Sequence, residues 1–352
     1  MVSKKGMIYS YLFFCERNFE MKNIKYDKEF KTFEEQISYL KNTYNLIIKN
    51  EDLALELLKI FPYYNLINGY KEYFMKNGKY SNTSLEDLVS IHLLDKNFLT
   101  IIFKYSTYVE DIFKHKLAYV ISSQSYNHVD KDFYLKDSKL FKKNFSSNII
   151  KTLEKILSNP NVEDPTKHYL KVHNHIPTWI FFKNVNFYEV TELFKIFNSD
   201  LKTDVIKMFY LFYKTKFKFN SPPKDYEKKA KRIEIFEKSL LTVRKFRNLI
   251  SHNLKVFTYT LNKGISTSYF NDTFINNFLI YSDKKYEGDL YTCIISIILL
   301  LDAPLSTFFI KDLQLIINEH KSHSNTYFKM YRLPSNFNEI LEKIYDELNH
   351  IK

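Results

Sequence analysis

The sequence contains little glycine, proline and cysteine. Five glycines and eight prolines are distributed over 352 residues, and so few turn-forming residues argue against a many-stranded sandwich and favour a mainly α protein. The two cysteines, Cys15 and Cys293, lie far apart and belong to no spaced set of ligands. They predict neither a disulfide framework nor a zinc site, so we expect a cytoplasmic protein that uses no metal and no other cofactor.

Long apolar runs are also missing from the sequence. The most apolar run, Cys293–Leu301, is too short to cross a bilayer and predicts a buried helix. The run from Met7 to Cys15 is followed at once by Glu16 and Arg17, with no small-residue cleavage site. We therefore expect neither a signal peptide nor a membrane partner.

Arginine is scarce although the chain is strongly basic. The formal net charge is +12 and the sequence pI about 9.2. This excess favours a polyanionic partner, through release of counterions from phosphates; lysine enrichment for solubility is the other interpretation. Only five of the 52 basic residues are arginine, so a position that keeps arginine indicates a need for the planar, permanently charged guanidinium.

Capping signals and apolar periodicity predict a multi-helical protein in four parts. These are a basic leader over 1–27, an N-terminal helical subdomain over 28–88, a larger helical domain over 89–318, and a C-terminal helix over 319–352. Helices are expected over residues 32–40, 51–60, 83–94, 97–122, 149–157, 200–213, 225–250, 286–301, 305–320 and 336–351. The helix over 51–60 is expected to point Leu53, Leu57, Leu58 and Ile60 inward, and Trp179, the only tryptophan, is expected in the core.

Three tyrosines, Tyr63, Tyr64 and Tyr70, lie in a stretch that predicts a tight corner between two helices. One interpretation is that they are buried and that their hydroxyls satisfy the loop. The other is that they form a surface that binds RNA by stacking. Both interpretations remain open from the sequence.

Three histidines, His168, His173 and His175, lie close together in the chain. Neighbouring histidines can bind a metal, but no cysteine or carboxylate completes a set at a familiar spacing. We therefore expect a loop there and no metal site.

A basic run follows the strongest break in the sequence, Asn220-Ser221-Pro222-Pro223. Charge runs are usually solvated faces, but this one begins the helix predicted over 225–250, shortly upstream of an arginine–histidine motif. A role in following RNA phosphates is therefore equally open. The run consists of Lys224, Lys228, Lys229, Lys231 and Arg232.

The arginine–histidine motif lies at the end of that helix. Arg244 and Arg247 are one turn apart, and His252 follows. RNA can be cut without metal when its 2′-hydroxyl attacks the neighbouring phosphorus, which needs proton transfer and cations at the phosphate oxygens. His252 is the candidate proton-transfer group, Arg247 the phosphate clamp and Arg244 a second cation. Asn248 and Asn253 are candidates for orienting the histidine or the phosphate.

Helix geometry limits what one copy of this motif can do. Over five residues a helix turns about 500° and rises roughly 7.5 Å, so Arg247 and His252 point about 140° apart. Acid and base for in-line cleavage are better supplied by two copies facing across a symmetry axis, which predicts a homodimer. The motif alone is equally compatible with a surface ion pair and a histidine placed favourably at a helix C-terminus.

Four stretches together resemble the bacterial abortive-infection family of AbiD/AbiF type. The segment Arg244–Asn253 is similar to the R-N-x-x-x-H signature of HEPN ribonuclease domains. Residues 28–37 and 63–70 are similar to the family's N-terminal signature, and Pro177-Thr178-Trp179 resembles its P-x-W stretch, in the expected order. Relatives often have an acid shortly after that stretch; here Phe181-Phe182-Lys183 occupies the region, so no role is expected for such an acid.

The resemblance implies a HEPN-like helical bundle that acts in phage defence by growth arrest, related to the nuclease domains of type VI CRISPR effectors. It also implies a metal-independent endoribonuclease toxin that leaves 2′,3′-cyclic phosphate ends, with Arg247 and His252 at its centre. Some relatives are associated with a structured noncoding RNA encoded nearby. A cognate RNA is thus an implied partner, beside a cellular or phage RNA target.

Three functions remain open from the sequence. The first is the RNA-cleaving defence enzyme. The second is a non-catalytic RNA-binding module that forms a complex with a noncoding RNA through the same basic helix. The third is a helical scaffold for protein interactions. A steep fall of RNA affinity with salt is expected for the first two and not for the scaffold.

Overall fold

The computed structural model describes residues 28–125, 130–158, 164–214, 224–265 and 288–350. Over these residues the protein is mainly helical, which confirms the predicted fold class. The predicted leader over 1–27 and the break at 220–223 lie outside the described residues. Contacts along the chain define two compact units, one of residues 1–63 and 74–85 and the other of residues 64–73 and 86–352.

The first unit contains two helices and a short antiparallel hairpin. The elements are α1 (Phe33–Asn42), α2 (Glu51–Ile60), β1 (Met75–Lys76) and β2 (Lys79–Tyr80). Helix α1 begins with the predicted capping box, in which Thr32 Oγ1 accepts from the Glu35 backbone N–H at 3.2 Å and the Glu35 carboxylate accepts from that of Thr32 at 2.7 Å. The start of this helix was therefore predictable from four residues.

The buried face of α2 is narrower than the apolar pattern predicts. Ala54 and Leu58, four residues apart, are buried, and α2 packs against α1. Leu53 and Ile60, predicted to point inward, are 45% and 67% exposed. Apolar periodicity places residues on a face, but the number of neighbouring helices decides how much of that face is covered.

The second unit contains the other described helices, with α3 and α4 crossing its border in the chain. They are η1 (Tyr64–Asn68, a π-helical turn), α3 (Lys71–Phe74), α4 (Leu85–Ser123), α5 (Lys131–Tyr134), η3 (Ser138–Leu140), α6 (Asn148–Leu157), α7 (Asp164–Val172), α8 (Thr178–Phe181), α9 (Phe187–Ile196), α10 (Ser199–Lys207), α11 (Tyr210–Lys214), α12 (Asp225–Ser251), α14 (Leu290–Leu300), α15 (Ala303–Glu319), α16 (Lys321–Met330) and α17 (Phe337–Asn349).

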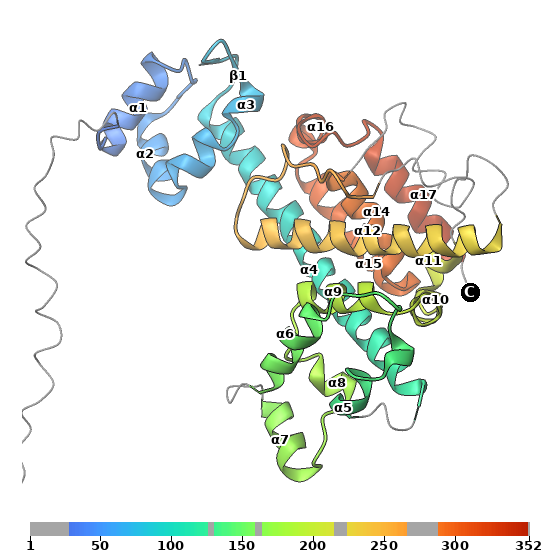
Figure 1. Ribbon diagram of the computed structural model, residues 1–352. Helices are drawn as coiled ribbons and strands as arrows, with labels where there is room; N and C mark the ends of the chain where they lie inside the picture. The colour runs from blue at the N-terminus through green and yellow to red at the C-terminus, as the bar shows by residue number, and fades with distance from the viewer. Residues whose placement is uncertain (1–27, 126–129, 159–163, 215–223, 266–287, 351–352) are drawn as a thin grey trace, which may run out of the picture. The chain divides into compact units, whose positions relative to one another are not determined.

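Helix α4 is continuous over 39 residues, or about 58 Å, where the sequence predicts two helices separated near Asp95-Lys96-Asn97. Asp95 and Asn97 are weak helix formers. Asp95, however, is buried and accepts hydrogen bonds from tyrosine hydroxyls of other elements, so long-range contacts keep the helix intact. It extends through the second unit as far as the small helices α5 and α8 (Figure 1).

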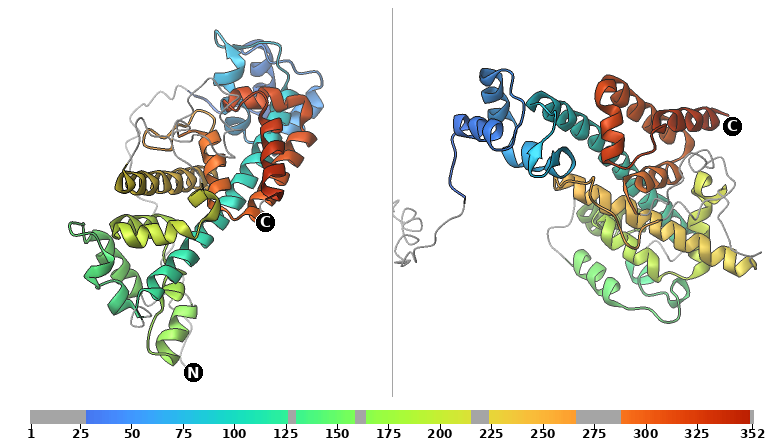
Figure 2. Two further views of the ribbon diagram at one scale, coloured as in Figure 1. Left: turned by 90° about the vertical axis from the view of Figure 1, so that its right-hand side faces the viewer. Right: turned by 90° about the horizontal axis from the view of Figure 1, so that it is seen from above.

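Helix α14 forms the centre of the second unit. All of its residues are buried, and it packs against α11, α12 and α15 (Figures 1 and 2). The hydroxyls of Ser296 and Thr292 are satisfied by backbone carbonyls one turn earlier: Ser296 Oγ donates to Thr292 O at 2.7 Å, and Thr292 Oγ1 to Asp289 O, the residue that caps the helix, at 2.8 Å. The prediction of a buried helix over Cys293–Leu301 is confirmed.

Three further expectations for this unit are corrected by the structure. The helix predicted over 200–213 is two helices, α10 and α11, and the C-terminal helix predicted over 319–352 is also two, α16 and α17. Trp179, expected in the core, is 44% exposed. Helix α8 has only one turn, and that turn buries Thr178 and Phe181, so the tryptophan between them faces outward.

Candidate functional site

The arginine–histidine motif lies where α12 ends. The helix stops at Ser251, and His252 caps it. Asn253 has a φ of 55°, its N–H donates to Ile250 O at 2.9 Å, and the Leu254 N–H donates to Leu249 O at 3.0 Å. This is a Schellman ending, with asparagine at the left-handed position that few other residues tolerate. Asn253 therefore determines where the chain turns after His252.

Arg247 is held by its neighbour and by α4. One terminal nitrogen donates to Asn248 Oδ1 at 3.2 Å, and the other lies 3.2 Å from the carboxylate of Glu110. Within the described part of the chain, the Nε of Arg247 has no hydrogen-bond partner. That nitrogen is itself buried, but the side chain as a whole is 30% exposed, so the guanidinium is fixed in place and a ligand can reach part of the side chain.

Asn248 and His252 are both exposed. Asn248 orients Arg247, and its backbone carbonyl accepts the N–H of His252 at 3.2 Å. A solvent-exposed imidazole at the end of the helix that carries this guanidinium can exchange a proton with a bound phosphodiester. Arg247, Asn248 and His252 are therefore the members of the predicted catalytic set that the structure presents at this end of α12.

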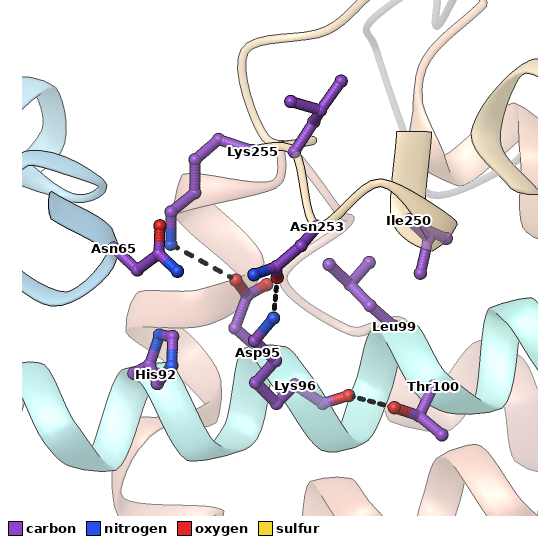
Figure 3. Close-up of a pocket in the computed structure, with 10 residues that line it drawn as sticks. Asn65, His92, Asp95, Lys96, Leu99, Thr100, Ile250, Asn253 and Lys255 are labelled. Atoms are coloured by element: carbon purple, nitrogen blue, oxygen red, sulfur yellow. Dashed lines mark hydrogen bonds and ion pairs between the residues drawn. The ribbon is translucent and has the colours of Figure 1, made fainter. Parts of the chain in front are cut away.

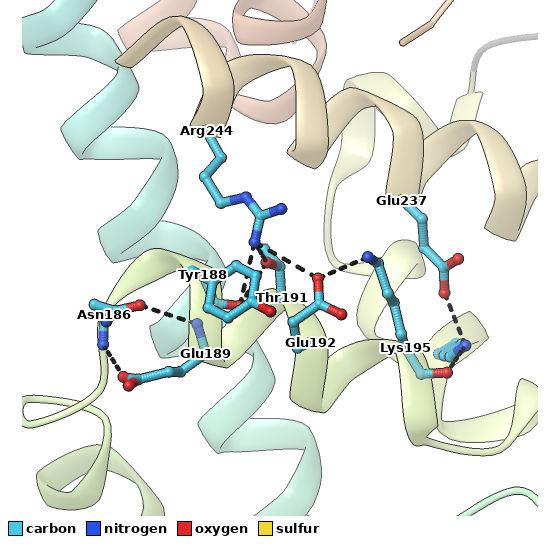
Figure 4. A network of polar contacts seen from close by, with 9 residues as sticks. Asn186, Tyr188, Glu189, Thr191, Glu192, Lys195, Glu237 and Arg244 are labelled. Atoms are coloured by element: carbon cyan, nitrogen blue, oxygen red, sulfur yellow. Dashed lines mark hydrogen bonds and ion pairs between the residues drawn. The ribbon is translucent and has the colours of Figure 1, made fainter. Parts of the chain in front are cut away.

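Arg244 is placed differently, in the interior. It is 5% exposed, and one terminal nitrogen donates to Thr191 Oγ1 at 2.8 Å and to Tyr188 O at 3.3 Å. The same guanidinium lies 3.6 Å from the Glu192 carboxylate and stacks over the Tyr188 ring (Figure 4). Arg244 thus fastens α9 to α12 and offers no exposed cation to a phosphate, so we leave it out of the candidate site.

The basic run lies at the opposite end of α12. Fifteen residues of helix separate Arg232 from Arg247, which corresponds to roughly 22 Å, and the run is therefore farther from the motif than the sequence reading assumed. Lysines of the run pair with carboxylates: Lys228 with Asp225 at 3.1 Å, and Lys229 with Asp200. Such exposed pairs are weak enough for a phosphate to replace the carboxylate.

The other members of the run and the predicted stacking tyrosines differ in exposure. Lys224 is exposed at the start of α12, Lys231 lies 3.3 Å from Glu234, and Arg232 lies over the Tyr213 ring. Tyr64 is 74% exposed, Tyr63 is partly buried, and Tyr70 is fully buried. Tyr70 therefore has no ring face available for a base, whereas Tyr64 has.

Tyr70 instead belongs to a buried polar cluster around Asp95. The carboxylate of Asp95 accepts hydrogen bonds from the hydroxyls of Tyr70 at 2.9 Å, Tyr331 at 2.5 Å and Tyr327 at 3.3 Å. His92 Nδ1 lies 3.0 Å from the Tyr70 hydroxyl. Burial and the acceptor carboxylate raise the pKa of each of these tyrosines well above its ordinary value, so they remain neutral donors.

A pocket of about 80 Å³ opens beside this cluster, between α4 and the end of α12 (Figure 3). We call it the Lys255 pocket. Lys255 crosses it, with its ammonium group 3.6 Å from the centre of the Tyr70 ring and 4.0 Å from the Asp95 carboxylate. The polar side chains that line the pocket are Asn65, His92, Asp95, Lys96, Thr100, Asn253 and Lys255.

Proton affinities in the Lys255 pocket are shifted by burial. Burial lowers the pKa of Lys255 to about 8; Asp95 opposes this shift, and the positive charge of Lys96 adds to it. Burial lowers the pKa of His92 to about 4, helped by Lys255 and Lys96. At neutral pH His92 is therefore uncharged, and the two lysines supply the positive charge of the pocket.

The sequence did not predict this pocket, although several of its residues lie in or beside the tyrosine-rich corner and the arginine–histidine motif. Asn65 and Gly69 belong to the tyrosine-rich corner, and Lys255 follows His252 by three residues. A methyl group on Gly69 would overlap the Lys255 side chain and the Asn65 backbone, so glycine makes room for the lysine. The polar Asp95-Lys96 pair inside an apolar helix was the available signal, but it fell between two predicted helices.

The histidine cluster shows no metal site. His168 lies on α7, and its ring centre is 5.6 Å from that of His173. His175 Nδ1 is 2.8 Å from His173 O. Across the described ranges, no group of three histidine, cysteine, aspartate or glutamate residues has the arrangement needed to hold a metal ion. His168 is helical, which corrects the expected loop at that residue.

The sequence was compared with family models, curated proteins and solved structures. A family model described as Abi-like protein matches residues 56–258. The chain belongs to this family. No curated protein and no solved structure matches it.

The matched region of this Abi-like protein includes the arginine–histidine motif and every residue that lines the Lys255 pocket, whereas Tyr327 and Tyr331 lie outside it. It begins in α2, contains η1, α4 and α12, and ends just after Lys255. Family membership supports a role in abortive infection. None of the helices in the described ranges is long and apolar enough to span a bilayer.

Proposed function

We propose that the protein acts in abortive infection by binding RNA at the end of α12 and cleaving it without a metal ion, as a HEPN-type endoribonuclease. The observation that carries the proposal is the pairing of Arg247, held by Glu110 and Asn248 yet 30% exposed, with an exposed His252 at one helix end. Family membership and the net charge of +12 support an RNA-directed defence role.

The reaction is an internal transfer of the phosphoryl group. A base removes the proton of the 2′-hydroxyl, whose oxygen attacks phosphorus while the bond to the 5′-oxygen breaks. An acid gives that oxygen a proton, and the products are a 2′,3′-cyclic phosphate and a 5′-hydroxyl. Arg247 stabilises the charge on the non-bridging oxygens, and His252 carries out one of the two proton transfers.

The second proton transfer requires another group. We propose that a second copy of the chain contributes its own His252 across a two-fold axis, so that one imidazole acts as base and the other as acid. Mixing wild type with the His252→Ala protein tests this. A mixed dimer with one His252 that loses activity as the all-variant dimer does supports a shared site, and a strictly monomeric active protein contradicts it.

The main test compares wild type with His252→Ala, using His173→Ala as a matched control because His173 is another exposed histidine. We expect His252→Ala to slow the formation of cyclic phosphate ends by about 100-fold or more, in the presence of a chelator, with RNA affinity unchanged. Equal cleavage by His252→Ala, or cleavage abolished by the chelator, would sink the proposal.

The non-catalytic alternative gives a different result in infected cells. If the protein protects by sequestering a noncoding RNA, the double variant Arg247→Ala, His252→Ala still protects cells from phage. If it protects by cleavage, the double variant loses protection while still accumulating as folded protein. Circular dichroism of the purified variant and its level in cells separate loss of chemistry from loss of fold.

A further inference from the structure

The Lys255 pocket carries an excess of positive charge. Lys96 and Lys255 contribute two ammonium groups, Asp95 one carboxylate, and His92 is neutral because its pKa is lowered to about 4. Like charges close together are unfavourable, and the lowered pKa of Lys255 shows that burial and the charge of Lys96 both act on it. An anion in the pocket would relieve this repulsion.

The carboxylate of Asp95 is not hydrogen-bonded closely to Lys255. This carboxylate already accepts three tyrosine hydroxyl hydrogen bonds, at 2.5–3.3 Å, while the distance to the Lys255 ammonium is 4.0 Å. The lysine instead lies over the Tyr70 ring, a contact that holds an ammonium group without neutralising it. Lys255 is thus positioned by the fold and keeps donors for a ligand.

The remaining wall of the pocket suits a phosphate group. Lys96 contacts the side-chain oxygen of Asn253, and the amide of Asn65 lies on the opposite side of the opening (Figure 3). Amides and ammonium groups are the usual donors to phosphate oxygens. The volume of about 80 Å³ is several times the roughly 10–15 Å³ that one water needs, so a compact polyatomic anion can enter.

The location of the pocket connects it with the arginine–histidine motif. Asn253, which lines the pocket, follows His252 directly, and Ile250 on the preceding turn also lines it. On α4, the face that carries Lys96 and Thr100 continues to Phe103 and Glu110, which contact Arg247. Pocket and motif therefore lie along one contact between α4 and α12.

We propose that the Lys255 pocket binds the phosphate of an RNA nucleotide that flanks the scissile linkage, held by Lys96 and Lys255; this rests on the proposed binding of RNA at the end of α12. The pocket is then a positioning site, which fixes the strand so that the neighbouring linkage reaches Arg247 and His252. Tyr64, exposed next to Asn65, offers a ring face to a base of the same strand.

The test measures the binding of RNA under conditions in which the proposed cleavage cannot occur. A fluorescent single-stranded RNA with 2′-fluoro sugars cannot be cleaved by the proposed reaction, and its affinity is measured by anisotropy over a range of salt concentrations. The variants are Lys96→Gln, Lys255→Gln and their combination. Lys171→Gln is the matched control, since Lys171 is an exposed lysine on α7, away from the end of α12 (Figure 1).

We expect the combined variant to bind about 10-fold more weakly than wild type, and the slope of log affinity against log salt to fall by about 0.7, the contribution of one phosphate in a single strand. The control keeps the wild-type slope. Lys96→Gln removes a charge outside the buried cluster, so it keeps the test valid if Lys255→Gln proves unstable. Pocket variants that match the control overturn the proposal.

Two further measurements complete the experiment. One distinguishes an RNA phosphate from a free ligand, and the other distinguishes failure of the proposed cleavage from failure of the proposed phosphate site. Titration with AMP and with inorganic phosphate identifies a free ligand. Micromolar AMP affinity that the pocket variants lose, with RNA affinity intact, overturns the assignment to an RNA strand. If wild type binds RNA without cleaving it, and the pocket variants bind it more weakly than wild type does, the proposal of cleavage is contradicted and the proposal of a phosphate site is supported. If wild type binds no RNA, both proposals fail.

Discussion

The ammonium group of Lys255 lies 3.6 Å from the centre of the Tyr70 ring. This contact joins the tyrosine-rich corner, early in the chain, to the residues that follow the arginine–histidine motif. Both stretches resemble signatures of one family, and in the chain they are far apart. The structure brings them together at one pocket, so the two stretches share a common location.

Binding of RNA by this pocket should depend on pH in a way that ordinary lysines do not. Burial lowers the pKa of Lys255 to about 8, against the ordinary value of 10.5, so its ammonium group loses its proton as the pH rises through about 8. We expect the affinity advantage of wild type over Lys255→Gln to shrink between pH 7 and pH 9.5. Anisotropy with the 2′-fluoro RNA measures it.

The matched variant for this prediction is Lys255→Arg, because arginine stays charged throughout this range. Its RNA affinity should be flat with pH, and a wild-type affinity that is equally flat would contradict the prediction. The lowered pKa also acts on folding. Between about pH 8 and 10.5 the unfolded chain binds more protons at this lysine than the folded one, so Lys255 makes the folded protein gain stability as the pH rises.

Gly69→Ala should weaken RNA binding from a position that carries no charge. The added methyl group would overlap the Lys255 side chain and the Asn65 backbone, so the lysine must leave the Tyr70 ring or the corner must shift. We expect an affinity loss comparable to that of Lys255→Gln. Combining the two substitutions should add little, since both act through one side chain. Fully additive losses would show that Gly69 acts by another route.

Asn253 should tolerate glycine and reject β-branched residues. Its φ of 55° places it in the left-handed region, which costs an L-residue roughly 1–2 kcal/mol unless it is glycine or asparagine. We expect Asn253→Val to lower the free energy of unfolding by about that amount, and Asn253→Gly to change it by less than about 0.5 kcal/mol. Urea unfolding curves measure both, and equal curves for the two variants would argue against the Schellman ending.

Arg244→Met should destabilise the fold without a specific loss of chemistry. The buried guanidinium holds Tyr188, Thr191 and Glu192 of α9, so its removal should cost about 2 kcal/mol of unfolding free energy. Lys245→Met, at the exposed neighbouring position, is the control and should stay within about 0.5 kcal/mol of wild type. If Arg244→Met unfolds like wild type yet abolishes cleavage, Arg244 belongs to the reaction after all.

Local features of this protein were readable from the sequence because they depend on neighbouring residues. The capping box of Thr32 and Glu35 marks the start of α1. The spacing of apolar residues predicts α12 to within one residue of its observed end, and the uniformly apolar run in α14 predicts burial. Arg247, Asn248 and His252 were placed at a helix end by the same local reasoning.

Only the tertiary structure decided which of these side chains a ligand can reach. Arg244 and Arg247 are one turn apart on the same helix, yet α9 covers the first and leaves the second partly exposed. The sequence predicts one helix that ends at Leu94 and another that begins at Asn97, whereas Asp95 lies buried inside the continuous helix α4. Its three tyrosine partners come from distant parts of the chain: Tyr70 directly precedes α3, Tyr327 lies on α16, and Tyr331 caps the C-terminus of α16. Burial and buried hydrogen bonds are set by residues distant in sequence, and for that reason the Lys255 pocket appears only in the folded protein.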